Sequence, residues 1–564
     1  MISNGMILIG TTKDAGTDVC IRPSMANRHG LIAGATGTGK TVTLRTLAES
    51  FSALGVPVFM ADAKGDLASM VDAGDAESTK DRAGAMGLYE KGFTYGGFPV
   101  CFWDVYGQTG LPLRTTVSEM GPVLLARIMD LNDTQSDILN IIFKIADDEG
   151  LLLIDLKDLK AMIGFVGENA KELSAKYGNI ATASLNSIMR AIVSIESESD
   201  ASGFGLARGE ETQSDKNRRQ GGDSFFGEPA LNIADWLLPD VSGKGIIEIL
   251  DCRKLMLSPR MYSMFMLWLM SELFETLPEV GDLDKPRMVF FFDEAHMLFD
   301  GAPKVLLEKI EQVVKLIRSK GVGIYFVTQN PRDIPDGVLA QLGNRIQHAL
   351  RAYTPAEMKG VKAAAQSFRE NPAFDTMKVL GELGTGEALV SVLDEKGVPT
   401  VVEMTMIAPP QSRLGTLDDA KRDDIVKKSM LYPRYNDFFD RDSAYEFLMR
   451  HKEEVAAAEA AQNAGDSTVY RGTAPTAPVQ TGNPLAEAQE RARLEKEALK
   501  AKSRKDNAVS KATTSIAKTV TGTIGRELGN SVGTSLLGKG FGKRLGGNVG
   551  ASIGRNLIGI FTGR

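Results

Sequence analysis

Residues 34–41, GATGTGKT, have the composition of a loop that binds nucleotide phosphates. They match the pattern GxxxxGK[ST] at every fixed position, and such glycines let backbone N–H groups turn inward around phosphate oxygens. A helical pattern, TVTLRTLAESF, follows an apolar run and this loop, which makes a chance match the weaker alternative. We expect Lys40 to reach the β- and γ-phosphates and the Thr41 hydroxyl to bind Mg²⁺. The predicted nucleotide-binding residues are Gly34, Ala35, Thr36, Gly37, Thr38, Gly39, Lys40, Thr41 and Val42.

A pair of carboxylates, Asp293 and Glu294, directly follows the apolar run at 289–292. A buried strand that ends in such a pair predicts that Asp293 holds the magnesium ion through water. Glu294 would polarise the attacking water, a role that hydrolysis requires and phosphate transfer by a kinase does not. The alternative is that the pair caps a helix.

Gln329 ends the next apolar run, 322–329, which follows an amphipathic helical pattern at 302–321. Its side chain could hydrogen-bond the γ-phosphate or the attacking water. The alternative is that Gln-Asn-Pro only forms a turn at the strand end.

Short apolar runs that alternate with helical patterns predict an α/β fold around a largely parallel sheet, which must bring these residues together. The segment at 111–237 has mostly helical periodicity and predicts an inserted helical subdomain, whose polar end at 196–224 predicts a loop. The predicted strands lie at 30–35, 56–63, 98–105, 245–251, 287–295, 322–329, 345–351, 387–393 and 400–406.

The remaining composition predicts several further parts. The predicted division is a short N-terminal strand segment at 1–28, a core at 29–110 and 238–410, the insertion at 111–237, a helical extension at 411–450, a linker with a charged helix at 451–505, and a basic Gly-rich tail at 506–564. Two sets of glycines in the tail recur at intervals of four, which favours either a helix with a small-residue face or a flexible segment. They are Gly525, Gly529 and Gly533, and then Gly542, Gly546, Gly550 and Gly554.

The overall composition is that of a soluble globular protein of 564 residues, with 43% hydrophobic and 24% charged residues. Its three cysteines and four histidines lack the spacing of disulfides or structural zinc, which favours the reducing cytoplasm. The most apolar segment, 261–270, is followed at once by Ser271 and Glu272, so we expect a buried helix and no membrane span. Residues 501–564 carry a formal charge of +9 and the preceding 500 carry −16, so only the tail is densely basic.

The chain contains six segments in this order: IAGATGTGKTVTL, ADAKGDL, FWDVYG, FFFDEAH, VTQNP and LGTGEALVS. With this ordered set, the chain resembles the HerA-like branch of the HerA/FtsK superfamily, and in particular the bacterial DUF853 family. The resemblance covers about residues 5–410. It implies a RecA-like P-loop ATPase core, ATP and Mg²⁺ as cofactors, and a homohexamer in which a neighbouring subunit supplies an arginine to each ATP site.

The position of that arginine in related coupling ATPases corresponds to Arg318, with Arg351 as a second candidate; either could instead be a surface cation. Asp62 and Lys64 are expected beside the phosphate loop, where local ion pairing would also explain them.

The resemblance favours a motor that pulls double-stranded DNA through a hexamer. A protein-moving ATPase and a nucleotide-switched assembly ATPase are the alternatives. DNA contacts could come from Lys64, from 318–323 or from the basic tail. Archaeal relatives dock a nuclease through an N-terminal β-barrel, whereas 33 residues precede Gly34 here, so that mode of docking is not expected. The candidate partners are a nuclease or another protein, and the tail could replace the barrel as an assembly or docking element.

Overall fold

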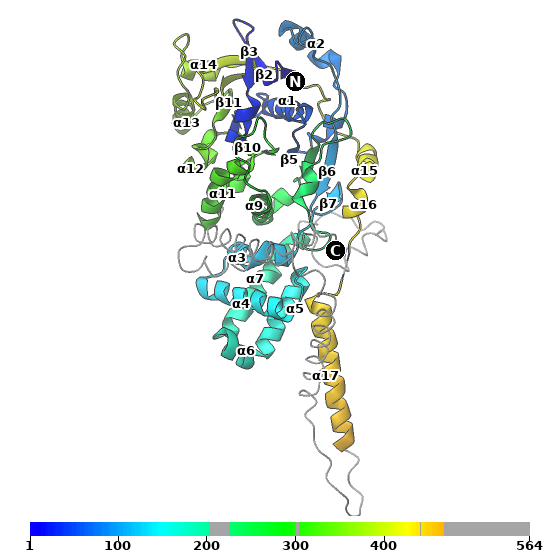
Figure 1. Ribbon diagram of the computed structural model, residues 1–564. Coiled ribbons are helices and arrows are strands. Elements are labelled where there is room, and N and C mark those ends of the chain that lie inside the picture. Colours follow the sequence, from blue (N-terminus) through cyan, green and yellow to red (C-terminus); the bar gives the residue numbers. More distant parts are fainter. Residues whose placement is uncertain (202–224, 301–303, 440, 467–564) are drawn as a thin grey trace, which may run out of the picture. The chain divides into compact units, whose positions relative to one another are not determined.

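The computed structural model describes residues 1–201, 225–300, 304–439 and 441–466, and it contains a 13-stranded sheet (Figure 1). One part of the sheet is parallel, in the order β11-β4-β10-β9-β5-β8-β6-β7. The predicted α/β fold with a largely parallel sheet is therefore confirmed. The parallel strands are β4 (Gly30–Ala33), β5 (Val58–Asp62), β6 (Val100–Asp104), β7 (Leu111–Pro112), β8 (Ile247–Asp251), β9 (Met288–Phe292), β10 (Val322–Thr328) and β11 (Asn344–His348).

Antiparallel strands extend the sheet beyond β11. In order they are β12 (Glu387–Ser391), β13 (Glu403–Ile407), β2 (Met6–Thr12) and β1 (Ile2–Ser3), and β3 (Asp18–Ile21) pairs with β2. The N-terminal residues therefore complete the same sheet as strands that lie almost 400 residues later in the sequence.

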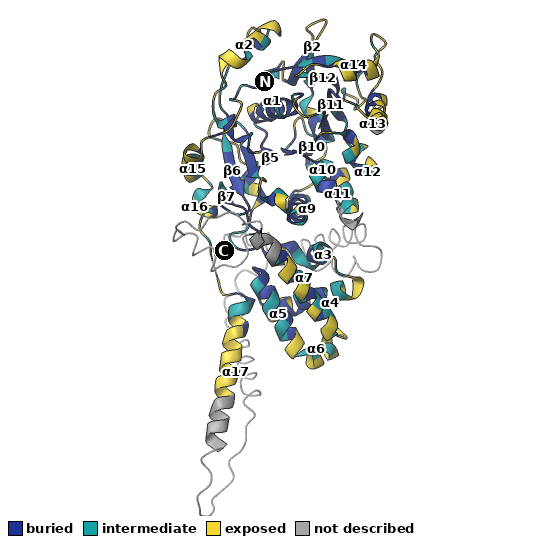
Figure 2. Cartoon of the chain, turned by 180° about the vertical axis from the view of Figure 1, so that it is seen from behind, coloured by how far each residue is buried: buried dark blue, intermediate teal, exposed yellow. Residues whose placement is uncertain are grey.

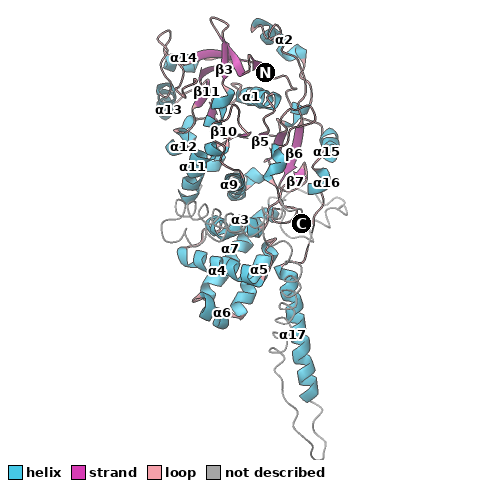
Figure 3. Ribbon diagram, in the orientation of Figure 1, coloured by secondary structure: helices cyan, strands magenta, loops and turns pink. Residues whose placement is uncertain are grey.

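Helices cover both faces of the sheet, because the side chains of successive strand residues point to opposite faces. Ile32, Phe291 and Tyr325 pack with α1 (Lys40–Ala53), whereas Phe290 and Phe292 share a core with α9 (Pro259–Thr276) and α11 (Lys304–Ile317). Figure 3 shows β5 and β10 between α1 and α9. Helix α9 contains the apolar segment predicted to be a buried helix, and its residues 261–270 are buried. In the described ranges, none of the helices combines the length and the apolar character that crossing a membrane requires.

The described part of the predicted insertion contains five α-helices that share one hydrophobic core with α9 and the sheet. Its first two residues form β7 and belong to the sheet. The loop predicted from residue 196 is wrong for its first part, because α7 continues to Ala201; a polar sequence does not by itself end a helix whose preceding turns are anchored in a core. Residues 202–224 lie outside the described residues. The five helices are α3 (Val117–Ile128), α4 (Asp133–Glu149), α5 (Leu156–Glu168), α6 (Ala170–Tyr177) and α7 (Thr182–Ala201).

Between the sheet and residue 466, the described residues form three further α-helices: α15 (Asp419–Lys428), α16 (Tyr432–Tyr435) and α17 (Ala444–Asp466). The predicted boundary after residue 450 falls within α17, whose residues 449–458 are exposed (Figure 2). The rest of the predicted linker, the charged helix and the basic tail lie outside the described residues. The other helices are α2 (Ala76–Ala85), α10 (His296–Phe299), α12 (Asp336–Leu339), α13 (Pro355–Gln366) and α14 (Thr376–Glu382).

Candidate active site

Four neighbouring parallel strands, β4, β10, β9 and β5, end at the same edge of the sheet. The phosphate loop follows β4, Gln329 follows β10, Asp293 and Glu294 follow β9, and Lys64 follows β5. Because all residues of these strands are buried, their register fixes where the residues that follow them emerge. The sheet thus gathers the predicted chemical groups at one edge.

The phosphate loop needs glycine for two physical reasons. Gly39, which directly precedes α1, has a φ of +112°, a left-handed conformation that disfavours residues with a Cβ atom. A Cβ atom on Gly34 would lie 2.5 Å from the His348 Cβ atom. The residue after β11 also anchors the loop, because the backbone N–H of Ala35 donates to the Ala349 carbonyl at 2.8 Å.

The Lys40 ammonium donates to the carbonyls of Gly34 at 2.7 Å and Ala35 at 3.0 Å, so it lies against the loop. Burial lowers the pKa of Lys40, and the nearby charge of Glu294 opposes that shift. A largely buried ammonium beside backbone N–H groups at a helix N-terminus fits a polyphosphate, which would offset the burial of its charge. Thr41 is partly exposed on the first turn of α1, where its hydroxyl could bind a metal ion held by that polyphosphate.

Asp293 is 4% exposed. Burial, reinforced by the adjacent Glu294, raises the pKa of Asp293 to about 7. A divalent cation would favour the ionised carboxylate, so the environment of Asp293 fits a Mg²⁺ ligand.

Glu294 occupies a left-handed backbone conformation with a φ of +47°, which is uncommon for a residue other than glycine. Its Oε1 atom lies 2.6 Å from the Lys64 ammonium, and its Oε2 atom accepts a 3.3 Å hydrogen bond from Gln329 Nε2. Burial raises the pKa of Glu294, but the hydrogen bond and charge of Lys64 outweigh burial, so that this pKa lies below its ordinary value.

Gln329 links Glu294 to the phosphate loop. Its Oε1 atom accepts a 3.4 Å hydrogen bond from the Thr36 hydroxyl, while its amide nitrogen donates to Glu294. The side chain therefore lies between the two parts of the site that the sequence predicts to act on the γ-phosphate and the attacking water.

Asp62 shapes the turn that carries Lys64. Its carboxylate accepts hydrogen bonds from the backbone N–H groups of Lys64, Gly65 and Leu67, at 2.7–3.2 Å. Burial raises the pKa of Asp62 to about 6. Asp62 thus orders the turn, and the ion pair of Lys64 is made across the sheet with Glu294.

The two candidate arginines lie in different places. Arg318 precedes β10, so the length of that strand, about 20 Å, separates it from the edge where Gln329 lies. Its guanidinium is 3.8 Å from the exposed carboxylate of Asp282. Arg351 follows β11, and its guanidinium donates to the carbonyls of Gly381 and Leu383 at the end of α14. Neither arginine contacts the phosphate loop of its own chain in the described contacts.

His348 is a component of the site that the sequence analysis missed. Its Nε2 atom lies 2.8 Å from the Thr43 hydroxyl, and its Nδ1 atom lies 3.0 Å from the Glu387 carbonyl. Burial lowers the pKa of His348 to about 4, so the ring is neutral at physiological pH. The available signal was a histidine in the middle of the strand predicted at 345–351.

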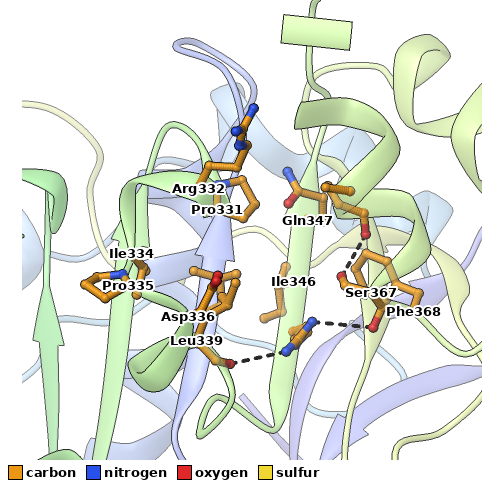
Figure 4. Close-up of a pocket in the computed structure, with 14 residues that line it drawn as sticks. Pro331, Arg332, Ile334, Pro335, Asp336, Leu339, Ile346, Gln347, Ser367 and Phe368 are labelled. Atoms are coloured by element: carbon orange, nitrogen blue, oxygen red, sulfur yellow. Dashed lines mark hydrogen bonds between the residues drawn. The ribbon is translucent and has the colours of Figure 1, made fainter. Parts of the chain in front are cut away.

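A cavity of about 550 Å³ lies over β4 and β11, beneath the segment at 331–339 (Figure 4). Arg345 in its wall donates to the carbonyls of Leu339 at 3.2 Å and Ser367 at 3.4 Å. No residue of the phosphate loop lines this cavity, so it is separate from the candidate active site.

The family described as Helicase HerA-like C-terminal matches residues 8–210 and 215–544. The chain belongs to this family. The resemblance to HerA-like proteins that the six motifs predict is confirmed.

A probable helicase of Methanocaldococcus jannaschii is 32% identical to this HerA-like chain over 120 residues, which is 21% of either protein. The unbound conjugative coupling protein TrwB matches 72% of this chain and 89% of its own, with 13% identity and a TM-score of 0.43. VirB4 of Thermoanaerobacter pseudethanolicus matches 72% of this chain and 97% of its own, with 15% identity and a TM-score of 0.43. A structure of TrwB with ADP and Mg²⁺ covers 74% of this chain and 96% of its own, with 14% identity and a TM-score of 0.42.

Proposed function

We propose that this HerA-like protein is an ATP-hydrolysing motor that assembles as a homohexamer in the cytoplasm and translocates double-stranded DNA. The observation that carries the proposal is the placement of Glu294 at the same sheet edge as the phosphate loop, joined to that loop through Gln329. Family membership supports a helicase-type motor over other uses of a phosphate loop.

In the proposed reaction, backbone N–H groups of the loop and the Lys40 ammonium bind the β- and γ-phosphates of ATP. Thr41 and, through water, Asp293 would hold Mg²⁺, which would supply charge neutralisation of the phosphate oxygens. Glu294 accepts a proton from the attacking water, and Gln329 orients that water or the γ-phosphate. An arginine of a neighbouring subunit, Arg318 or as second choice Arg351, stabilises the transition-state charge.

A protein-moving ATPase is the second candidate function. The formal charge of −16 on the first 500 residues favours it, because an acidic body repels the DNA backbone. A nucleotide-switched assembly ATPase is the third candidate and would use the same site without moving a substrate. A further protein partner fits each of these candidate functions.

The test is ATP turnover with and without duplex DNA, on protein whose subunit number is determined by native mass measurement. Lys40→Ala should abolish nucleotide binding and turnover. Glu294→Gln should retain ATP binding and lose about 10²–10⁴-fold in kcat, because the general base is removed. Glu370→Gln, which changes an exposed carboxylate, is the matched control and should turn over ATP like the wild type.

Each outcome separates the candidates. Hexamers whose turnover DNA stimulates support the DNA motor, hexamers indifferent to DNA favour the protein-moving ATPase, and monomers favour the switch. Unchanged turnover in Glu294→Gln contradicts the role of Glu294 in water activation.

A further inference from the structure

A chain of polar contacts connects the phosphate loop to an exposed cation. Thr36 donates to Gln329, Gln329 donates to Glu294, and Glu294 pairs with Lys64. The distances are 3.4, 3.3 and 2.6 Å, and the four residues follow four different strands. We name these four residues the relay.

The two ends of the Lys64–Glu294 pair differ in exposure. The Glu294 side chain is 9% exposed, whereas the Lys64 side chain is 47% exposed. The turn beneath Lys64 is fixed by the backbone hydrogen bonds to Asp62, so the exposed ammonium can exchange partners without movement of the strand. Because the Lys64 end of the pair faces solvent, salt can screen its charge and another anion can approach it.

The pair also affects what Glu294 can do. A positive charge at 2.6 Å neutralises the carboxylate and occupies Oε1, while Gln329 occupies one acceptor position of Oε2. A carboxylate engaged in this way exerts less pull on the proton of a water molecule.

We infer that Lys64 is a positioning residue that restrains Glu294 until a phosphate of the DNA backbone takes the ammonium. An ammonium is a compact point charge that binds phosphate oxygens well, and it lies here at the exposed end of the relay. Release of Lys64 frees Glu294 to accept a proton, so that DNA contact and ATP turnover are coupled through one side chain. This inference rests on the proposed DNA-dependent ATPase.

The test compares Lys64→Met, which removes the charge and keeps most of the stem, with Lys64→Arg, which retains a cation. Lys64→Met should raise kcat in the absence of DNA several-fold and lose the stimulation by duplex DNA, with the affinity for a fluorescent ADP analogue unchanged. Lys64→Arg should retain the stimulation. Lys144→Met is the matched control, because Lys144 is 50% exposed and pairs with Asp148 far from the site in sequence.

A Lys64→Met rate without DNA that equals or falls below that of the wild type overturns the inference. So does Lys64→Met protein that DNA still stimulates to the wild-type extent. Failure of the proposed function has a different signature, because the wild type itself would then hydrolyse no ATP or would ignore DNA. If the wild type hydrolyses ATP but ignores DNA, the kcat of Lys64→Met without DNA still tests whether Lys64 restrains Glu294.

Discussion

Glu248 offers a test of the sheet that positions the site. It lies on β8, next to β5, and its side chain is fully buried. Trp103 Nε1 donates a 2.6 Å hydrogen bond to its Oε2 atom. Burial raises the pKa of Glu248 to about 8, so the folded protein holds this carboxyl in its neutral form at neutral pH.

The expected size of the effect follows from proton linkage. Between the ordinary pKa of 4.5 and about 8, the folded protein keeps a proton that the unfolded chain releases. The stabilisation from this proton is complete below pH 4.5 and is lost as the pH rises to about 8. That window spans roughly 3.5 pH units, and about 1.4 kcal/mol per unit gives on the order of 5 kcal/mol.

Glu248→Gln replaces the carboxyl with a neutral amide that can still accept from Trp103. The variant should therefore gain free energy of unfolding relative to the wild type as the pH rises from 5 to 8.5, by several kcal/mol. Urea unfolding followed by tryptophan fluorescence measures this difference. Glu370→Gln, an exposed carboxylate, is the control and should follow the wild type at both pH values. An identical pH dependence in Glu248→Gln and the wild type would refute a neutral buried carboxyl at this position.

Two further predictions concern the candidate arginines. Arg318→Ala should lower kcat by about 10³-fold or more if this residue completes a neighbour's site, with ADP affinity retained; turnover equal to that of wild type would remove Arg318 from that role. Arg351→Ala removes a cation that binds the last carbonyls of α14, so it should lower the free energy of unfolding by about 1 kcal/mol, measured by thermal unfolding. The kcat of this variant in an ATPase assay should be unchanged. A large fall in kcat with unchanged stability would instead favour Arg351 as the arginine that acts across subunits.

The sequence predicted the location of the site because its motifs follow strand ends. Apolar runs before Gly34, Asp293 and Gln329 predicted buried parallel strands, and parallel strands bring their carboxyl ends to one edge. The strand positions are therefore well determined by local patterns. The predicted loop from residue 196 failed because the helix there depends on a core that local composition does not reveal.

Side-chain partners across the sheet were not predictable in the same way. The pairing of Lys64 with Glu294 depends on β5 lying directly beside β9, although about 230 residues separate them in the sequence. The contact between His348 and the back of the phosphate loop likewise depends on β11 lying beside β4. Strand order decides such contacts, and a single sequence does not specify it.

The same strand order bears on assembly. Arg318 and Gln329 lie at opposite ends of β10, and a rigid buried strand holds them about 20 Å apart, so Arg318 cannot reach the phosphates that its own loop would bind. Within one chain, Lys64 pairs with Glu294, and Lys40 lies near enough for the charge of Glu294 to act on it. A single chain therefore has groups that fit a nucleotide, whereas Arg318 could act at the transition state only in the site of another copy. If Arg318 has that role, nucleotide binding should be independent of assembly, and turnover should require it.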